Sequence, residues 1–382
     1  MDPISVIIGF YLLVLVIVYA RRILILRDFP FLPKQSINAA PFVSIIVPVR
    51  NTASTIEACL ISLIGLEYDR KEVIVVDGDS TDGTFDVARR FENKILLLRE
   101  PQLEKGWVGK NFACYYGRGF AKGDILLFTD GDTIHDRHCL SSAVHYLLSN
   151  DLDMLSIWPE MKMNGFWERT ILPFVFARYF IDFEGKKVNS EKSKKFAAFG
   201  PYILIRKEAY DSVGGHASVR ESTEEDYRLA EVLKSAQKKC RVLSSNNMVC
   251  TRMYSSLKEI WAGLVKNSFE GYNSSVTTIA IEILLSFFVG VLPFALLGYF
   301  LSTSLSGGTI TFLFLLTFFA CLAIIVQQAV IYRILGYTSW FAIFLPCATI
   351  VLMGILAHST YLALSGKGVS WKGRTYETGR RQ

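Results

Sequence analysis

Long runs without charge stand on either side of one polar block. Residues 3–20 contain no charged side chain, and residues 283–366 contain only one, Arg333. A helix crosses a bilayer with about 20 apolar residues, so the pattern predicts one membrane helix near the N-terminus and three in the C-terminal region. Buried core helices are the alternative, but such helices rarely follow one another with almost no polar face. The C-terminal helices are expected near 276–301, 305–332 and 337–364.

The polar block, residues 35–275, alternates short apolar runs with longer amphipathic segments. Strands are expected at 43–49, 72–77, 95–98 and 125–129, and helices at 54–66, 81–92 and 110–122. Alternating strands and helices predict an α/β domain with a mainly parallel sheet, which binds ligands beyond the carboxyl ends of its strands. The predicted division is an anchor and linker at 1–34, the α/β domain at 35–275, membrane segments at 276–365 and a basic tail at 366–382.

The charges beside the apolar runs predict the orientation. Asp2 precedes the first run, whereas Arg21, Arg22 and Arg27 follow it. A cleaved signal peptide has positive charge before its apolar run, so we expect a retained helix, and the positive-inside rule places the polar block in the cytoplasm of a multi-pass cell-membrane protein. Four crossings would put the basic tail outside, against the same rule. One apolar segment is therefore expected to be re-entrant or a hairpin, with breaks at Pro293 or Pro346.

Composition excludes several classes of protein. The chain is 51% hydrophobic and 20% charged, which excludes a disordered protein. Its seven cysteines include no C-x-x-C pair, which excludes a zinc ribbon and a disulfide scaffold. The net charge of +6 is concentrated beside the membrane segments, which indicates anionic lipid headgroups rather than nucleic acid as the partner.

Two acidic clusters follow predicted strands. The first is Asp77-Gly78-Asp79, and its carboxylates can accept hydrogen bonds from a nucleoside; an ordinary Asp/Gly turn before a helix is the alternative. The second is Asp130-Gly131-Asp132, whose oxygens suit Mg²⁺ or Mn²⁺ bridging to a substrate phosphate. Many turns contain such a pair, but here it follows an apolar strand.

Two further positions carry candidate chemistry. Lys110 stands at a predicted helix start, where free N–H groups and an ammonium can meet a diphosphate, unless it is simply solvated. Glu224-Glu225-Asp226 precedes another predicted helix, and one of these carboxylates can act as a general base. Acidic residues are also common in a first helical turn simply because they stabilise the positive end of the helix dipole.

The ordered set of motifs resembles glycosyltransferase family 2, the inverting GT-A enzymes. The matching stretches are Val47-Pro48-Val49-Arg50-Asn51, Val76 to Thr84, the Asp130/Asp132 pair and Glu225-Asp226. Further stretches resemble the branch that contains hopanoid- and carotenoid-associated enzymes and, more distantly, ceramide glucosyltransferases: Gly106 to Lys110, Gly214-Gly215-His216, Arg252 to Ser255 with Trp261, and Trp371 to Arg374. The Gln/Arg-x-x-Arg-Trp signature of processive synthases is missing, so chain elongation is not expected.

The resemblance implies a Rossmann-like GT-A domain and a role for each motif residue. Asp77 and Asp79 would bind the nucleoside, and Lys110 would lie near the nucleotide. Pro48 and Asn51 would also belong to the donor-binding site, and Asp226 would be the base. Asp132, with Asp130, would hold Mg²⁺ or Mn²⁺. The predicted function is metal-dependent, inverting transfer of a hexose from a nucleotide sugar, with a UDP-sugar favoured, to a lipid hydroxyl.

Two other functions stay open at this stage. Transfer to a polyprenyl phosphate would need the base less, because a phosphate is already ionised. A transporter subunit or an inactive membrane scaffold is the alternative outside enzymes, although a transporter usually places polar groups inside its spans. The aromatic segment 166–180 is expected to be an interfacial helix or a core helix.

Overall fold

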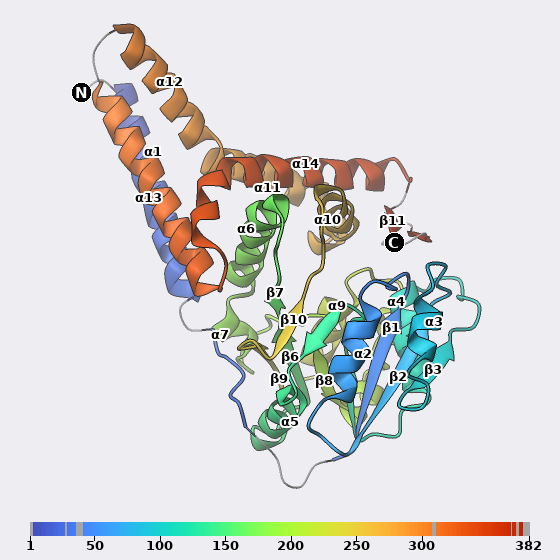
Figure 1. Cartoon of the computed structure of the whole chain (residues 1–382). Coiled ribbons are helices and arrows are strands. Elements are labelled where there is room, and N and C mark those ends of the chain that lie inside the picture. Colours follow the sequence, from blue (N-terminus) through green and yellow to red (C-terminus); the bar gives the residue numbers. More distant parts are fainter. Residues whose placement is uncertain are drawn as a thin grey trace. The chain divides into compact units, whose positions relative to one another are not determined.

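The computed structural model describes residues 3–26, 29–35, 41–307, 311–367, 369–371 and 374–376. The chain forms two compact units. One unit contains residues 29–162 and 185–253, and the other contains the first helix, residues 163–184 and everything from residue 254 onward. Figure 1 shows the elements of both. The predicted motif Trp371 to Arg374 lies outside the residues whose side chains are described.

The first unit is built on a seven-stranded sheet in the order β3-β2-β1-β4-β8-β6-β9. Its strands are β1 (Val43–Val49), β2 (Lys71–Asp77), β3 (Leu96–Arg99), β4 (Ile125–Phe128), β6 (Met154–Trp158), β8 (Ile203–Arg206) and β9 (Cys240–Ser244). Strands β1 to β4 pair in parallel, and β8 is antiparallel to both of its neighbours. The mainly parallel sheet predicted from the alternating pattern is confirmed.

Helices cover both faces of this sheet because its buried strands are apolar on both sides. Ile45 packs in the cluster that includes α2 and α5, whereas Ile46 packs in the cluster that includes α4 and α9. The helices of this unit are α2 (Ile56–Ile64), α3 (Thr84–Arg89), α4 (Gly109–Arg118), α5 (Cys139–Ser149), α7 (Gly185–Val188), α8 (Lys207–Ser212), η1 (Gly215–Val219) and α9 (Glu225–Ser235). A small second sheet joins β5 (Thr133–His135), β10 (Val249–Thr251) and β7 (Glu160–Met161).

The second unit consists mainly of apolar helices. They are α1 (Pro3–Leu26), α6 (Phe166–Phe183), α10 (Leu257–Gly271), α11 (Val276–Gly290), α12 (Leu292–Gly307), α13 (Phe312–Ile334), η2 (Ser339–Phe344) and α14 (Leu345–Leu364), with a short pair β11 (Val369–Trp371) and β12 (Arg374–Tyr376). Four segments are long and apolar enough to cross a membrane: Ser5–Leu26, Val276–Gly307, Phe312–Ile334 and Ser339–Leu364. The prediction of one such helix at the N-terminus and three in the tail is confirmed. The expected breaks occur, since Pro293 lies beside the α11–α12 junction and Pro346 in the first turn of α14.

Candidate active site

The two acidic clusters meet at one edge of the sheet. Strand β1 lies between β2 and β4, with Val49 opposite Asp77 and Ile46 opposite Phe128. Because all three strands are parallel, their carboxyl ends lie at the same edge. Asp77 is the last residue of β2, and Asp130 comes two residues after β4. The structure thus brings together residues that are more than 50 positions apart in the chain.

Asp77 has one carboxylate oxygen without a partner in the described structure. Its side chain is buried, its Oδ2 accepts from the backbone N–H of Ser80 at 3.2 Å, and its Oδ1 has no hydrogen-bond partner. A buried acceptor without a partner is costly, so this oxygen suits an N–H or hydroxyl donor from a ligand. Asp79 is exposed beside it in the left-handed backbone region, at φ 61°.

The residues after β1 hold this acidic loop. Asn51 Oδ1 accepts from the backbone N–H of Thr81 at 2.9 Å, and the Asn51 N–H donates to the Ser80 hydroxyl at 3.0 Å. Arg50 donates to the carbonyl oxygens of Gly78 and Asp79. Asn51 is therefore a scaffold for the loop in this structure. Pro48 lies inside β1 opposite Val76.

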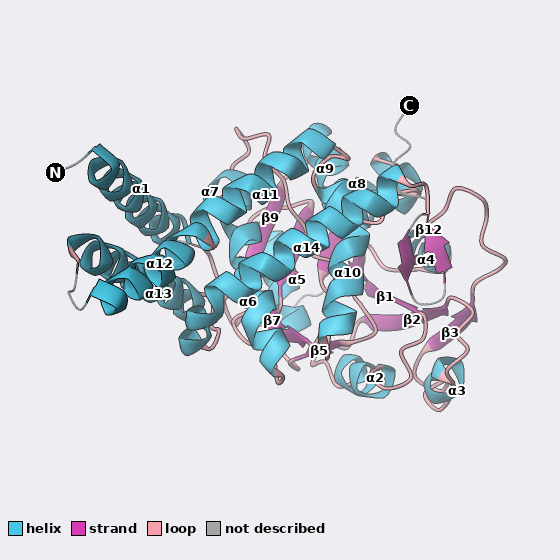
Figure 2. Ribbon diagram, turned by 90° about the horizontal axis from the view of Figure 1, so that it is seen from above, coloured by secondary structure: helices cyan, strands magenta, loops and turns pink. Residues whose placement is uncertain are grey.

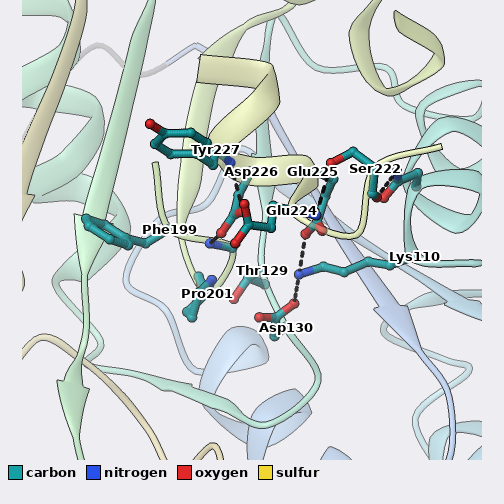
Figure 3. Close-up of polar contacts among 12 residues, drawn as sticks. Lys110, Thr129, Asp130, Phe199, Pro201, Ser222, Glu224, Glu225, Asp226 and Tyr227 are labelled. Carbon is teal, nitrogen blue, oxygen red and sulfur yellow. Dashed lines mark hydrogen bonds and ion pairs between the residues drawn. The ribbon is translucent and has the colours of Figure 1, made fainter. Parts of the chain in front are cut away.

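Lys110 joins the second acidic cluster to the acidic residues of α9. Its Nζ lies 2.6 Å from Asp130 Oδ1 and 2.7 Å from Glu225 Oε1 (Figure 3). Burial alone would lower the pKa of Lys110, but Asp130, Glu225 and Asp226 raise it well above its ordinary value. The ammonium therefore stays charged. Sequence reasoning included Lys110 but did not pair it with Glu225.

Asp226 lies in the first turn of α9, with both of its oxygens hydrogen-bonded. Oδ2 accepts from the backbone N–H of Gly200 at 2.7 Å, and Oδ1 from that of Tyr227 at 2.8 Å. Burial and the adjacent Glu225 raise the pKa of Asp226 to about 6, while Lys110 and the two N–H groups act in the opposite direction. A carboxylate with a pKa near neutrality is well suited to accept a proton.

Gly200 is the residue around which these groups gather, and the motif analysis missed it. A Cβ built on Gly200 would lie 2.7 Å from Lys110 Nζ and 3.4 Å from both Asp130 Oδ2 and Asp226 Oδ2. Any side chain would therefore displace the lysine or press on a carboxylate. The Gly-Pro dipeptide at 200–201 marks a turn, but nothing in the sequence places that turn in the site.

The Thr129 hydroxyl connects the strand that leads to Asp130 with the loop that contains Gly200. It donates to the Pro201 carbonyl oxygen at 2.7 Å and lies 3.1 Å from His135 Nε2. A hydroxyl has one proton and a carbonyl can only accept, so His135 Nε2 donates to Thr129. Burial lowers the pKa of His135 to about 3, which keeps its ring neutral.

Asn111 holds the loop that leads into α9. Its Nδ2 donates to the carbonyl oxygens of Val219, Arg220 and Ser222 at 2.8, 3.2 and 2.9 Å. The loop before Glu225 is thereby tied to α4, the helix that carries Lys110. The sequence motifs did not single out Asn111.

Asp132 is anchored by the small sheet. The Thr251 hydroxyl donates to Asp132 Oδ1 at 3.2 Å, and Gly131 is required because a Cβ there would lie 2.8 Å from the Val49 side chain. Within the described ranges, no group of three or more His, Cys, Asp or Glu residues could hold a metal ion. Mg²⁺ commonly takes only one or two protein carboxylates and completes its shell with phosphate and water. The Asp130 and Asp132 donor set fits a metal of that kind.

Two motifs outside this constellation have structural partners. In Gly214-Gly215-His216, the Tyr210 hydroxyl accepts from the His216 backbone N–H at 2.9 Å and lies 2.8 Å from His216 Nδ1. Gly215 leaves room for the Tyr210 ring. In the helical unit, Trp261 Nε1 donates to His358 Nδ1 at 2.9 Å. The segment expected to be an interfacial or core helix forms α6.

Comparison with known proteins agrees with this geometry. The sequence model of the family described as "Glycosyl transferase family 2" matches residues 44–214, which include both acidic clusters. Residues 44–214 of this chain are thus similar to glycosyltransferase family 2. The match ends before α9, so it does not include Glu225 or Asp226.

Two relatives of this chain are 4,4'-diaponeurosporenoate glycosyltransferases. That of Staphylococcus haemolyticus is 26% identical over 70% of this chain and 71% of its own length. That of Staphylococcus aureus is 28% identical over 62% of this chain and 64% of its own length, slightly under two thirds. Both relatives are carotenoid-associated enzymes. The sequence motifs of this chain resemble the branch that contains such enzymes.

One solved structure shares the fold over almost the whole chain. The mannosyltransferase PcManGT from Pyrobaculum calidifontis, in complex with GDP-Man and Mn²⁺, superposes with a TM-score of 0.56 and 18% identity, covering 94% of this chain and 98% of its own. The domain built on the seven-stranded sheet is thus a GT-A-like α/β domain.

Proposed function

We propose that this chain is a membrane-integral, metal-dependent, inverting glycosyltransferase that moves a hexose from a nucleotide sugar to a lipid acceptor at the cytoplasmic face. The observation that carries the proposal is the convergence of Asp77, Asp130 and Asp226 at one sheet edge, with Lys110 bonded to Asp130. Asp77 offers a free acceptor to the nucleoside, and Asp226 offers a base of raised pKa. An inactive scaffold or a transporter subunit would not need these groups together.

The donor would lie across the carboxyl ends of β1, β2 and β4. Asp77, with Asp79 and the scaffold residue Asn51, would bind the nucleoside, and Lys110 would meet the diphosphate. A nucleotide sugar is also the ligand named for PcManGT, which is in complex with GDP-Man. A UDP-sugar is the donor we favour from the sequence motifs, and the donor screen below decides between nucleobases.

Asp130 and Asp132 would hold Mg²⁺ or Mn²⁺. Three carboxylates, Asp130, Glu225 and Asp226, act on the one ammonium of Lys110, and Asp132 follows two residues after Asp130, so the region favours a further cation. When bound, such a metal neutralises charge on the leaving nucleoside diphosphate. PcManGT is in complex with Mn²⁺.

Asp226 would accept the proton of a hydroxyl acceptor. Gly200 and Tyr227 hold its two oxygens in place. Attack from the face opposite the leaving diphosphate would invert the anomeric carbon.

An anionic lipid acceptor is the second candidate. The two relatives are named for 4,4'-diaponeurosporenoate, a carboxylate. A carboxylate or a polyprenyl phosphate is already ionised, so Asp226 would then orient the acceptor rather than remove a proton. The size of the loss of kcat in Asp226→Asn separates hydroxyl acceptors from anionic acceptors.

A donor screen tests the proposal. The purified chain, in detergent with Mn²⁺ or Mg²⁺, is incubated with a panel of nucleotide sugars, and release of nucleoside diphosphate is measured. We expect hydrolysis of one donor class that EDTA abolishes. A failure to bind or turn over any donor would contradict the proposal and favour a scaffold.

A further inference from the structure

The last apolar helix, α14, begins against α6, the helix that follows the first stretch of the glycosyltransferase unit in the chain. The turn η2 directly precedes α14, and the rings of Phe344 and Phe341 lie 5.0 and 6.0 Å from that of Phe166. Phe166 is the first residue of α6 and follows Lys162, the last residue of the preceding stretch of the glycosyltransferase unit, by four positions. The start of α14 therefore lies beside the first turn of α6, four residues after the chain leaves the glycosyltransferase unit.

The C-terminal half of α14 packs along α10, the helix that follows the second stretch of the glycosyltransferase unit in the chain. Ser359 Oγ accepts from the Phe269 N–H at 3.1 Å and donates to the Val265 carbonyl at 2.7 Å, and His358 accepts from Trp261. Helix α10 carries Lys258, Glu259, Lys266 and Glu270 among 15 residues. Such a helix does not lie in the hydrocarbon core, so both ends of α14 lie at the same face of the bilayer.

Helix α11 runs beside α14 and, like α14, does not cross the bilayer in the arrangement described here. Gly290, at the end of α11, packs against Thr349, near the start of α14. Figure 2 shows the two helices side by side. Halfway along α11, Glu282 forms an ion pair with Arg178 of α6 and accepts from Ser286 at 2.9 Å. A charged pair in mid-helix is costly at the bilayer centre.

By contrast, α1, α12 and α13 form an upright group within this unit (Figure 1). Gly9 of α1 packs on Leu316 near the start of α13, and Tyr19 interacts with Tyr332 near its end, so the two helices run in the same direction. Helix α12 packs against α13 and runs in the opposite direction, with Ser304 near its end bonded to Thr311 just before α13.

The geometry points to three crossings, α1, α12 and α13, with α11 and α14 embedded in the lipid leaflet at which α1 and α13 end. The partner of the outward face of α14 is therefore the acyl region of that leaflet, against exposed Ile350, Tyr361 and Leu364. The chain then leaves α14 on the side of Arg21, Arg22 and Arg333. This arrangement satisfies the positive-inside rule, which four crossings would violate for the basic tail.

Site-directed thiol labelling tests this topology without any need for turnover. Single cysteines replace three exposed residues, Gln102 in the glycosyltransferase unit, Ser306 at the end of α12 and Ser365 just after α14. The background carries alanine at Cys250 and Cys347, because the other five native cysteines are buried. A membrane-impermeant maleimide is applied to intact cells and to inside-out vesicles, and labelling in detergent gives the total for each variant.

We expect Gln102→Cys and Ser365→Cys to label in the same preparation and Ser306→Cys in the other. Labelling of Ser365→Cys together with Ser306→Cys would overturn the inference, because α14 would then cross. If a variant is not produced, protease removal of an epitope tag after Gln382 gives the same answer, since the tag must be cut in the preparation that labels Gln102→Cys. Reversal of all three positions together would contradict only the cytoplasmic placement of the proposed function.

Discussion

Replacing Asp226 by Asn removes the proposed base while keeping its shape. Asn Oδ1 can still accept from one of the two N–H groups, of Gly200 or Tyr227, that hold the carboxylate. In the proposed site, donor binding would depend on Asp77 and the Lys110–Asp130 region, and the substitution leaves these residues in place. The expected effect therefore falls on kcat rather than on the KM for the donor.

The size of the effect depends on the acceptor. A positioned base contributes about 10²–10⁴-fold to proton removal from a neutral hydroxyl. We expect Asp226→Asn to lower kcat by at least about 10²-fold with a hydroxyl lipid. With a carboxylate or phosphate lipid there is no proton to remove, and the loss should be far smaller.

The raised pKa of Asp226 gives two further readouts. In the parent, kcat should fall about tenfold per pH unit below the value of about 6, because the protonated carboxyl cannot act as a base. A carboxyl whose pKa rises on folding stabilises the protein below its unfolded pKa, and this stabilisation is lost as the pH rises through about 6. Ionised Asp226 therefore costs the native state at most about 3 kcal/mol at neutral pH, and Asp226→Asn should keep or raise Tm at pH 7.

These outcomes differ from those of a residue that only stabilises a helix. An acidic side chain in the first turn of α9 would contribute about 0.3–1 kcal/mol of stability, so its loss would lower Tm and leave turnover intact. The assay measures initial rates from pH 5 to 8 for parent and variant, with Tm by differential scanning fluorimetry. Near-normal kcat with a hydroxyl lipid, together with an unchanged acid limb, would refute the base assignment.

Substitutions at four further residues test the rest of the site. Asp132→Ala should abolish turnover in a folded protein, as EDTA should for the parent, and full activity in excess EDTA would remove the metal from the mechanism. Asp77→Asn should weaken nucleoside diphosphate binding, measured by calorimetry, because one carboxylate oxygen that we propose accepts from the nucleoside is lost; unchanged affinity would place the nucleoside elsewhere. Lys110→Met should raise the donor Kd and also lower Tm, since it leaves the buried Glu225 and the partly buried Asp130 without their cation; a variant with parental Kd would make Lys110 purely structural. Thr129→Val should lower kcat about tenfold or more while Thr129→Ser keeps it, because the Gly200 loop loses its anchor; equal rates in the two variants would contradict that link.

The local patterns predicted much of the sheet and its site edge. Strands β1, β2 and β4 are buried on both faces, so each contains an unbroken apolar run, such as Ile45 to Val49 in β1. Because these strands are parallel, the sequence pattern alone predicts that Asp77 and Asp130 lie at the same edge of the sheet. The start of α9 at Glu225 was likewise readable, because acidic residues precede its amphipathic stretch.

The contacts that complete the site could not be read in this way. Gly200 precedes β8, whose antiparallel insertion between β4 and β6 depends on long-range pairing. Thr129 was visible as a strand residue, but its bond to Pro201 joins positions 72 residues apart. Hydropathy also gave four candidate spans, since α14 is apolar all round whether it crosses a bilayer or lies within one leaflet.

Sugar transfer to a membrane lipid is the most direct test of the central claim. The purified chain is reconstituted in nanodiscs with lipids extracted from its host, a radiolabelled nucleotide sugar and Mn²⁺, and the organic phase is analysed by mass spectrometry. We predict one glycosylated lipid whose formation requires the divalent metal and is lost in Asp132→Ala, with the anomeric configuration opposite to that of the donor. Label that never enters the lipid fraction with any donor, or enters it equally without metal and in Asp132→Ala, would contradict the account.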